Sequence, residues 1–330
     1  MKKNTALLCL FLILATLLSA CGKKAEPTAE PPAEPPVEEA QGPDLTILYE
    51  QDDSMINSYT LLAVDPEAPF VDADGNAVAD VEINAAGADA LINWLLTADA
   101  EKMASEYGYD TYGEYLFYLY DSAPVSTAEI APATPDTAVI RLSTTTSVND
   151  SGLLGYLLPA FEEAYGYTVE VYSAGTGKAI ANAKAGNADL ILVHAKKQEE
   201  AFVEDGFSRV LDGFDSERLT FLYNYFVLCG PSADPAKAAE APDVKEAFAR
   251  IAATESTFVS RGDKSGTHTK ELSLWAEDLG ITDDPESVKG YEWYVYSNAG
   301  MGTCLTMAEE MGGYILSDKA TFLTFRAGNL

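Results

Sequence analysis

The fold is decided by residues 138–166, AVIRLSTTTSVNDSGLLGYLLPAFEEAYG. Residues 138–142 form a short β-prone run, and residues 143–147 are all serine or threonine. The leucines and the phenylalanine between 151 and 165 then fall on one face of a helix, and Gly166 is a suitable stop. A strand, a short loop and a helix in this order are the building unit of α/β folds with largely parallel sheets.

The unit recurs along the chain, and each helix begins directly after a turn rich in Gly, Ser or Thr. Such a turn presents free backbone N–H groups and hydroxyl donors. One turn alone is explained by helix capping, but four turns aimed at one cleft would bind a compact oxyanion. The further strands are expected at 168–172, 190–193, 257–260 and 293–296, and the further helices are expected to end at Ala185 and Gly280 and to cover 303–311.

Composition excludes several classes of function. The chain has 330 residues, with 52 acidic against 21 basic side chains and a formal net charge of −31. This charge argues against a nucleic-acid partner, because neutralising phosphates requires clustered Lys and Arg. With two histidines and four scattered cysteines, neither a metal site nor a cofactor is expected. At 47% apolar residues, however, the chain can bury a sizeable core.

The first residues are typical of an export signal. Lys2 and Lys3 precede an apolar run, and residues 18–22, LSACG, have the pattern of a bacterial lipoprotein signal in which Cys21 carries the lipid. An ordinary secretory signal with a chance cysteine is the alternative. Cleavage after residue 20 removes both lysines and brings the formal charge from −31 to −33. Residues 21–43 then read as a Pro/Glu-rich tether that holds the protein outside the cytoplasm at a membrane surface.

Several strings resemble the tungstate-binding proteins of ABC transporters. The most specific are LSTTTSVNDSGLL at 142–154 and FVSRGDKSGTH at 258–268. The shorter strings GTG at 175–177, LVHA at 192–195, YNYF at 223–226, GMG at 300–302 and SDKAT at 317–321 follow the order of that family. The resemblance implies a two-lobed α/β fold of the periplasmic-binding-protein type (type II), whose lobes close on the anion.

The order of the chain departs from that family and predicts a circular permutation. Residues 44–53, 57–66 and 88–103 resemble the family's carboxyl-terminal portion, although they come first here. The old ends would then be joined by about 120–137, which is plausible for termini at one surface. The alternative is an unrelated small domain over 44–120 before a truncated binding protein. The predicted parts are a first lobe at 57–222, a second lobe at 223–330, a strand and hinge at 44–56, and hinge crossings near 51–59 and 222–227.

The resemblance also implies which residues bind the anion. Those matching its anion loops are Thr145, Thr146, Ser147, Thr176, Arg261, Ser265, Gly266 and Thr267. The guanidinium of Arg261 matches a tetrahedral dianion, although an ion pair with Asp263 is a simpler role. Helix capping is the alternative for 145–147, but Asn149, Asp150 or Ser151 is better placed to cap the following helix.

The remaining polar residues receive ordinary interpretations. His194 and His268 are more simply structural side chains than ligand contacts. Cys229 and Cys304 lie in the exported part, where a disulfide is possible, but spacing cannot establish pairing.

The predicted function is capture of tungstate or molybdate by a monomeric, lipid-anchored receptor that serves an ABC permease. Phosphate and sulfate are competing ligands of the same class. A scaffold or adhesion lipoprotein is a second possibility. A serine hydrolase using Ser147 or Ser265 is a third, but the chain has no Gly-x-Ser-x-Gly elbow, and neither serine has an obvious base apart from the nearby His268.

Overall fold

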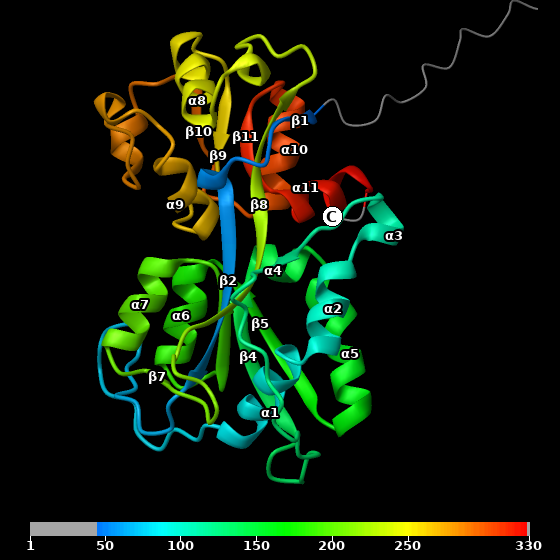
Figure 1. Cartoon of the computed structure of the whole chain (residues 1–330). Coiled ribbons are helices and arrows are strands. Elements are labelled where there is room, and N and C mark those ends of the chain that lie inside the picture. Colours follow the sequence, from blue (N-terminus) through cyan, green and yellow to red (C-terminus); the bar gives the residue numbers. More distant parts are fainter. Residues whose placement is uncertain (1–44, 329–330) are drawn as a thin grey trace, which may run out of the picture. The chain divides into compact units, whose positions relative to one another are not determined.

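The computed structural model describes residues 45–328 (Figure 1). The expected signal segment, the lipidated Cys21 and the tether up to residue 43 lie outside the described residues. Over 45–328 no helix has the length and apolar character needed to cross a membrane. The described chain forms two α/β lobes, which is the architecture that the sequence predicts.

The first lobe is built on a sheet whose core strands are parallel. Strand β4 pairs in parallel with β5 on one side and with β6 on the other, and β2 adds to β6 in the antiparallel sense. Its strands are β2 (Ile56–Val64), β3 (Tyr118–Leu119), β4 (Val139–Thr145), β5 (Thr168–Ala174), β6 (Leu190–Val193), β7 (Ser208–Arg209) and the first half of β8 (Leu219–Pro231). Its helices are α1 (Ala85–Leu95), α2 (Ala98–Glu106), α3 (Tyr109–Tyr112), α4 (Thr146–Asp150), α5 (Leu153–Tyr165), α6 (Thr176–Lys184) and α7 (Lys196–Glu204).

The second lobe is smaller and packs around aromatic side chains. Phe248, Phe258 and Trp275 meet with ring centroids 4.6–5.4 Å apart, in edge-to-face or tilted geometry. Its strands are β1 (Leu45–Tyr49), β9 (Phe258–Ser260), β10 (Tyr294–Tyr296), β11 (Ile315–Asp318) and the second half of β8. Its helices are α8 (Val244–Ala253), α9 (Gly266–Leu272), α10 (Met301–Met311) and α11 (Lys319–Arg326), with 3-10 turns η1 (Asp53–Met55), η2 (Ala238–Glu240), η3 (Glu277–Leu279) and η4 (Pro285–Val288).

Two long strands connect the lobes. In Figure 1, β2 and β8 run from the first lobe toward the second. Strand β8 pairs with β2 and β3 through its first half and with β1 and β11 through its second half. Asn57 of β2 lies opposite Asn224 of β8, and their side-chain amides hydrogen-bond at 3.0 Å. The crossing strands are therefore tied to each other where the lobes meet.

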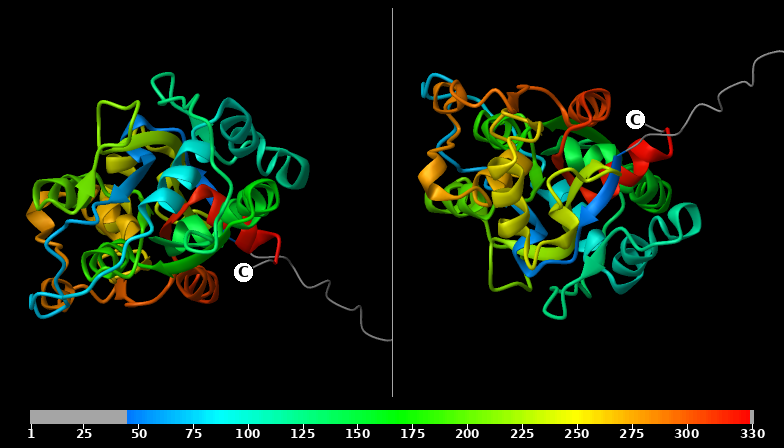
Figure 2. Two further views of the ribbon diagram at one scale, coloured as in Figure 1. Left: turned by 90° about the horizontal axis from the view of Figure 1, so that it is seen from below. Right: turned by 90° about the horizontal axis from the view of Figure 1, so that it is seen from above.

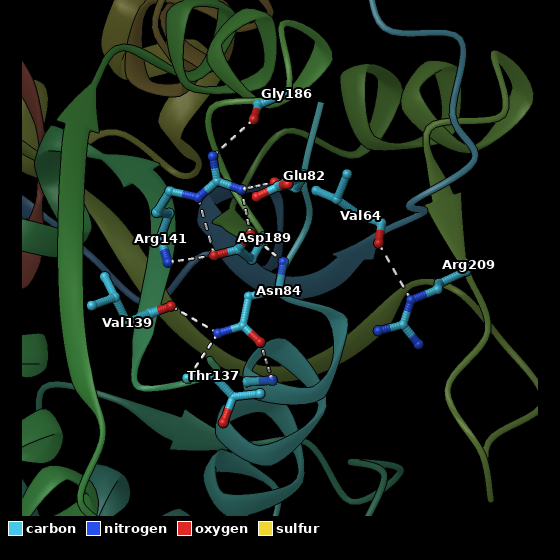
Figure 3. Close-up of polar contacts among 10 residues, drawn as sticks. Val64, Glu82, Asn84, Thr137, Val139, Arg141, Gly186, Asp189 and Arg209 are labelled. Carbon is cyan, nitrogen blue, oxygen red and sulfur yellow. Dashed lines mark hydrogen bonds and ion pairs between the residues drawn. The ribbon is translucent and has the colours of Figure 1, made fainter. Parts of the chain in front are cut away.

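The segment before residue 120 is part of both lobes. Strand β1 belongs to the second lobe, whereas β2 and α1 contribute Leu61, Leu91 and Ile92 to the first lobe's core. Figure 3 shows how residues 82–84 are fixed: the buried Asp189 accepts from the backbone N–H of Asn84 at 2.8 Å and from Arg141, whose guanidinium also donates to the Glu82 carbonyl. The segment is thus bound to the strands of the first lobe rather than standing alone.

Helices α1 and α2 complete one face of the first lobe. Both views of Figure 2 place the cyan helices beside the green helix α5. Trp94 of α1 contacts Phe161 of α5 at 5.5 Å between ring centroids, and Tyr107 after α2 contacts Tyr156 at 5.1 Å. The apolar face predicted for the 151–165 helix is confirmed, because its leucines and Phe161 are all buried here.

One local prediction is wrong. The helix expected to end at Gly280 ends at Leu272, because the chain then turns to bury Trp275 against Phe248 and Phe258. Only a 3-10 turn follows before Gly280. Near residue 150, Thr145 caps the short helix α4. Ser151, one of the residues predicted to cap the following helix, accepts through Oγ from the N–H of Leu153, the first residue of α5, at 3.3 Å.

Candidate functional site

The first lobe gathers polar side chains at one edge of its sheet. Because β4, β5 and β6 are parallel, their carboxyl ends lie at the same edge. The chain leaves β4 at Thr145–Ser147, leaves β5 shortly before Thr176 and leaves β6 at His194. A hydrogen bond joins two of these exits: Ser147 Oγ lies 2.9 Å from His194 Nε2.

The second lobe contributes a buried arginine. Arg261 directly follows β9, which runs parallel to β10, and only 3% of the residue is exposed. Its Nη2 pairs with Asp263, so the simpler role predicted for it is present. The loop after β10 supports its backbone, since the Ala299 N–H and the Ser297 hydroxyl both donate to the Arg261 carbonyl.

The hydroxyls predicted for the site are mostly buried, and some also cap helices. Thr145 Oγ1 accepts from the Val148 N–H at 3.4 Å, and Ser265 Oγ accepts from the His268 N–H at 3.3 Å. An accepting hydroxyl still has its own proton to donate. Of the eight predicted residues, Thr146 is half-buried and the other seven are buried, namely Thr145, Ser147, Thr176, Arg261, Ser265, Gly266 and Thr267.

Buried polar atoms without a hydrogen-bond partner concentrate near the same strand ends and in the first turn of α9. Within residues 45–328 there are seven such side-chain atoms, and only Glu101 Oε1 lies elsewhere, on α2. A buried donor or acceptor that lacks a hydrogen-bond partner is unfilled, and each one costs about 1–3 kcal/mol of folding free energy. A cluster of them therefore needs an explanation. The other six are Ser173 Oγ, Thr176 Oγ1, His194 Nδ1, Arg261 Nε, Thr267 Oγ1 and His268 Nε2. Three of these residues, Thr176, Arg261 and Thr267, were predicted from the sequence.

The two polar edges face each other across the lobes. A Cβ added to Gly266 would come within 2.5 Å of Cε1 and 2.7 Å of Nδ1 of His194, so the second lobe's backbone touches a first-lobe ring. The pKa of His194 is lowered to about 4, mainly by burial and further by the nearby Arg261 charge. Burial raises the pKa of Asp150, and the same guanidinium opposes that shift. Arg261 therefore acts on side chains of the first lobe.

Both histidines, which the sequence analysis interpreted as structural, lie at the candidate site. His268 is fully buried, and its Nδ1 accepts from the Lys264 N–H at 3.0 Å. The neutral ring must then carry its proton on Nε2, which is an unfilled donor. Burial lowers the pKa of His268 and favours this neutral form. His194 could have been found from its position, because it ends the third parallel strand at the edge where the predicted loops lie.

A cavity of about 720 Å³ opens between the lobes beside the predicted site. Both lobes line it: Lys196 and Lys197 begin α7, whereas Gly266, Thr269 and Lys270 belong to α9. Of the eight predicted anion-binding residues, only Gly266 lines this cavity. His194 also lines it while holding Ser147, so its ring lies between the cavity and the first anion loop.

The disulfide that the sequence left open is not formed in the described part of the chain. Cys229 and Cys304 are buried free thiols that pack in one apolar cluster. Over residues 45–328 no group of three or more His, Cys, Asp or Glu side chains is placed to hold a metal ion.

The comparison with protein families decides the affiliation. The family model described as "PBP superfamily domain" matches residues 131–330. The chain belongs to the PBP superfamily. The matched residues include all eight predicted anion-binding residues and the strands that precede their loops, namely β4, β5, β6, β9 and β10.

Relatives of this PBP chain include two tungstate-binding proteins named TupA. The protein from Peptoclostridium acidaminophilum is 46% identical over 190 residues, and that from Campylobacter jejuni is 36% identical over 181 residues. These matches cover 57% and 55% of this chain, respectively, and 62% of each relative's length. A crystal structure of the tungstate ABC transporter from Geobacter sulfurreducens is 43% identical over 58% of this chain and 76% of that chain, with a TM-score of 0.49.

Proposed function

We propose that this protein is an extracytoplasmic, lipid-anchored receptor that captures tungstate or molybdate between its lobes and delivers it to an ABC permease. The observation that carries the proposal is the cluster of six unfilled buried side-chain atoms around the carboxyl ends of the parallel strands. The names of the two TupA relatives supply the identity of the oxyanion. The permease and the extracytoplasmic location rest on the resemblance of the sequence strings to the tungstate-binding proteins of ABC transporters. The lipid on Cys21 rests on the sequence pattern alone.

The chemistry of the cluster suits a small dianion. Arg261 brings a permanent positive charge with Nε unfilled, and hydroxyls of Thr176 and Thr267 supply neutral donors. The proposed ligand set is Thr145, Thr146, Ser147, Thr176, Arg261, Ser265, Gly266 and Thr267. The negative charge of the whole chain does not oppose binding at contact, because surface charges beyond a Debye length of about 8 Å are largely screened.

The test is calorimetric titration of residues 22–330, prepared without the lipid, with tungstate, molybdate, sulfate and phosphate in turn. One-to-one tungstate binding that excess sulfate does not displace would support the proposal. Tight binding of phosphate or sulfate, without tungstate binding, would show that the receptor's ligand is that other oxyanion. A folded sample that binds none of the four would favour a scaffold or adhesion role.

Hydrolysis is a second candidate because one observation favours it. We expected neither serine to have a base apart from His268, which is wrong for Ser147, since His194 Nε2 lies 2.9 Å from its Oγ. However, a His pKa of about 4 makes a weak base near neutral pH, and no carboxylate orients Nδ1, which has no partner. We therefore propose binding without catalysis, and steady turnover of p-nitrophenyl acetate that Ser147→Ala abolishes would contradict this.

We further propose that the chain is a circularly permuted member of its family. The family match starts at residue 131 and runs to residue 330, yet β1, β2, α1 and α2 are integral to the two lobes. A chain rearranged to begin near residue 131, with residue 330 joined to residue 44, should fold and bind with an unchanged dissociation constant. A rearranged chain that stays unfolded would contradict the permutation.

A further inference from the structure

His194 joins the first anion loop to the end of a neighbouring strand. It directly follows β6, and 8% of the residue is exposed. Its Nε2 lies 2.9 Å from Ser147 Oγ, which in turn lies 3.2 Å from Thr145 Oγ1. The orientation of the Ser147 hydroxyl therefore depends on which atom the imidazole presents to it.

The ring of His194 is held from three directions. Tyr59 of β2 lies 5.5 Å away and Phe226 of β8 lies 6.4 Å away, measured between ring centroids. These two strands are the crossings between the lobes. On the remaining side the ring meets the backbone of Gly266, where a Cβ would lie 2.5 Å from Cε1. The contact with Gly266 exists only while the lobes are together.

We propose that His194 is a positioning residue that fixes the Ser147 hydroxyl for the oxyanion when the second lobe closes on its ring. This inference rests on the proposed function. A neutral imidazole that donates from Nε2 to Ser147 Oγ leaves the serine proton free for the anion, and Nδ1 is then an unprotonated acceptor beside the Gly266 backbone. If Ser147 instead donates to Nε2, its proton is unavailable to the ligand. Closure at Gly266 restrains the ring in the orientation that keeps Nε2 against Ser147 Oγ.

The same contacts have a simpler explanation, in which the ring only fills space between Tyr59 and Phe226. His194→Phe keeps an aromatic ring there but removes the hydrogen bond to Ser147. His194→Gln places an amide group within reach of Ser147. If the ring acts through Ser147, the Phe variant should bind tungstate about tenfold more weakly, which corresponds to one hydrogen bond to a charged group, and the Gln variant should recover most of that loss.

A double-mutant cycle with Ser147→Ala isolates the pair. In the Ser147→Ala background, His194→Phe should weaken binding less than about twofold, because the hydroxyl that the ring positions is gone. Gly266→Ala should also weaken binding, since its Cβ prevents the ring and the second lobe from meeting. Circular dichroism and melting temperature without ligand show that each variant is folded.

The closing experiment is tungstate titration of the wild type and these variants, with ¹⁵N-histidine NMR of the wild type. We expect the bound wild type to show the proton of His194 on Nε2. Wild-type binding combined with an unchanged dissociation constant for His194→Phe, or with the proton on Nδ1, would overturn the inference and leave the proposed function standing. A wild type that binds no oxyanion would overturn both.

Discussion

Two buried polar clusters of this protein differ in how far their hydrogen bonds are filled. Where β2 and β8 connect the lobes, the fully buried carboxylate of Asp318 accepts from Asn224 at 2.5 Å, from Tyr59 at 2.9 Å and from Asn57 at 3.3 Å through Oδ2, while Oδ1 accepts from the Thr321 N–H. At the candidate site, equally buried atoms of Thr176, Arg261 and Thr267 have no partner. Filled clusters fix the fold, whereas unfilled donors are available for a ligand.

The largest expected effect breaks the filled cluster. Asp318→Ala removes the shared acceptor and leaves the amides of Asn57 and Asn224 and the Tyr59 hydroxyl short of a partner. The unfolding free energy should fall by about 3 kcal/mol, measured by urea denaturation without ligand. Asp318→Asn, which keeps one acceptor oxygen, should lose less. If Asp318→Ala were as stable as the wild type, the cluster would not secure the fold.

Removing the charge from the unfilled cluster should weaken ligand binding and leave the fold stable, which is the opposite of the effect expected for Asp318→Ala. Arg261→Ala should weaken tungstate binding by about ten- to a hundredfold, because a charge-assisted contact to the dianion is lost. Its fold should remain intact by circular dichroism. Arg261→Lys is the matched control, since it keeps the charge without the planar fork and should bind with intermediate affinity. An unchanged dissociation constant for Arg261→Ala would remove Arg261 from the site.

Glu101 tests whether an unfilled buried atom always indicates a ligand. Burial raises the pKa of its carboxyl from 4.5 to about 7, so the folded protein keeps a proton that the unfolded chain has lost. The unfolding free energy should therefore fall as pH rises from about 4.5 to 7, with a slope of up to about 1.4 kcal/mol per pH unit. Glu271, whose pKa burial also raises to about 7, adds to the same slope.

The control for that pH dependence is Glu101→Gln, which cannot ionise. This variant should flatten part of the slope between pH 5 and 7 and should leave the tungstate dissociation constant unchanged. Weakened binding by Glu101→Gln would show that α2 is coupled to the site, and an unchanged slope would show that Glu101 is ionised in the folded protein.

The sequence predicted what depends on local patterns. Strand β6 lies at 190–193 as predicted, and the polar loops after β4, β5 and β9 follow from the alternation of strand, turn and helix. The role of His194 depends on Gly266 in the other lobe, and the early end of α9 depends on Trp275 joining Phe248 and Phe258. Such contacts between distant segments leave no periodic pattern in the chain.

The two strands that connect the lobes show the same limit of prediction from the sequence. Both crossings were predicted from the sequence, but no role was predicted for Asn57 or Asn224. The structure places the two amides in direct contact and adds Asp318, which no pattern near the crossings indicates. A buried acceptor recruited from β11 becomes visible only when the strands are paired.

The smallest expected effect gives the sharpest test of whether unfilled atoms are available for a ligand. The same substitution should weaken tungstate binding without lowering the unfolding free energy. Thr176→Val keeps the shape of the side chain and removes a buried hydroxyl that has no partner in the protein. Without ligand, the unfolding free energy should stay constant or rise by up to about 1 kcal/mol, since an unfilled polar group is gone. Tungstate should nevertheless bind about fivefold more weakly, since one donor to the anion is lost.

Thr144→Val is the matched control: its hydroxyl donates to the Leu192 carbonyl at 2.7 Å, so this change should destabilise the fold and leave binding by the folded protein unchanged. If both variants lowered stability alike, the hydroxyl of Thr176 would be structural and not reserved for a ligand.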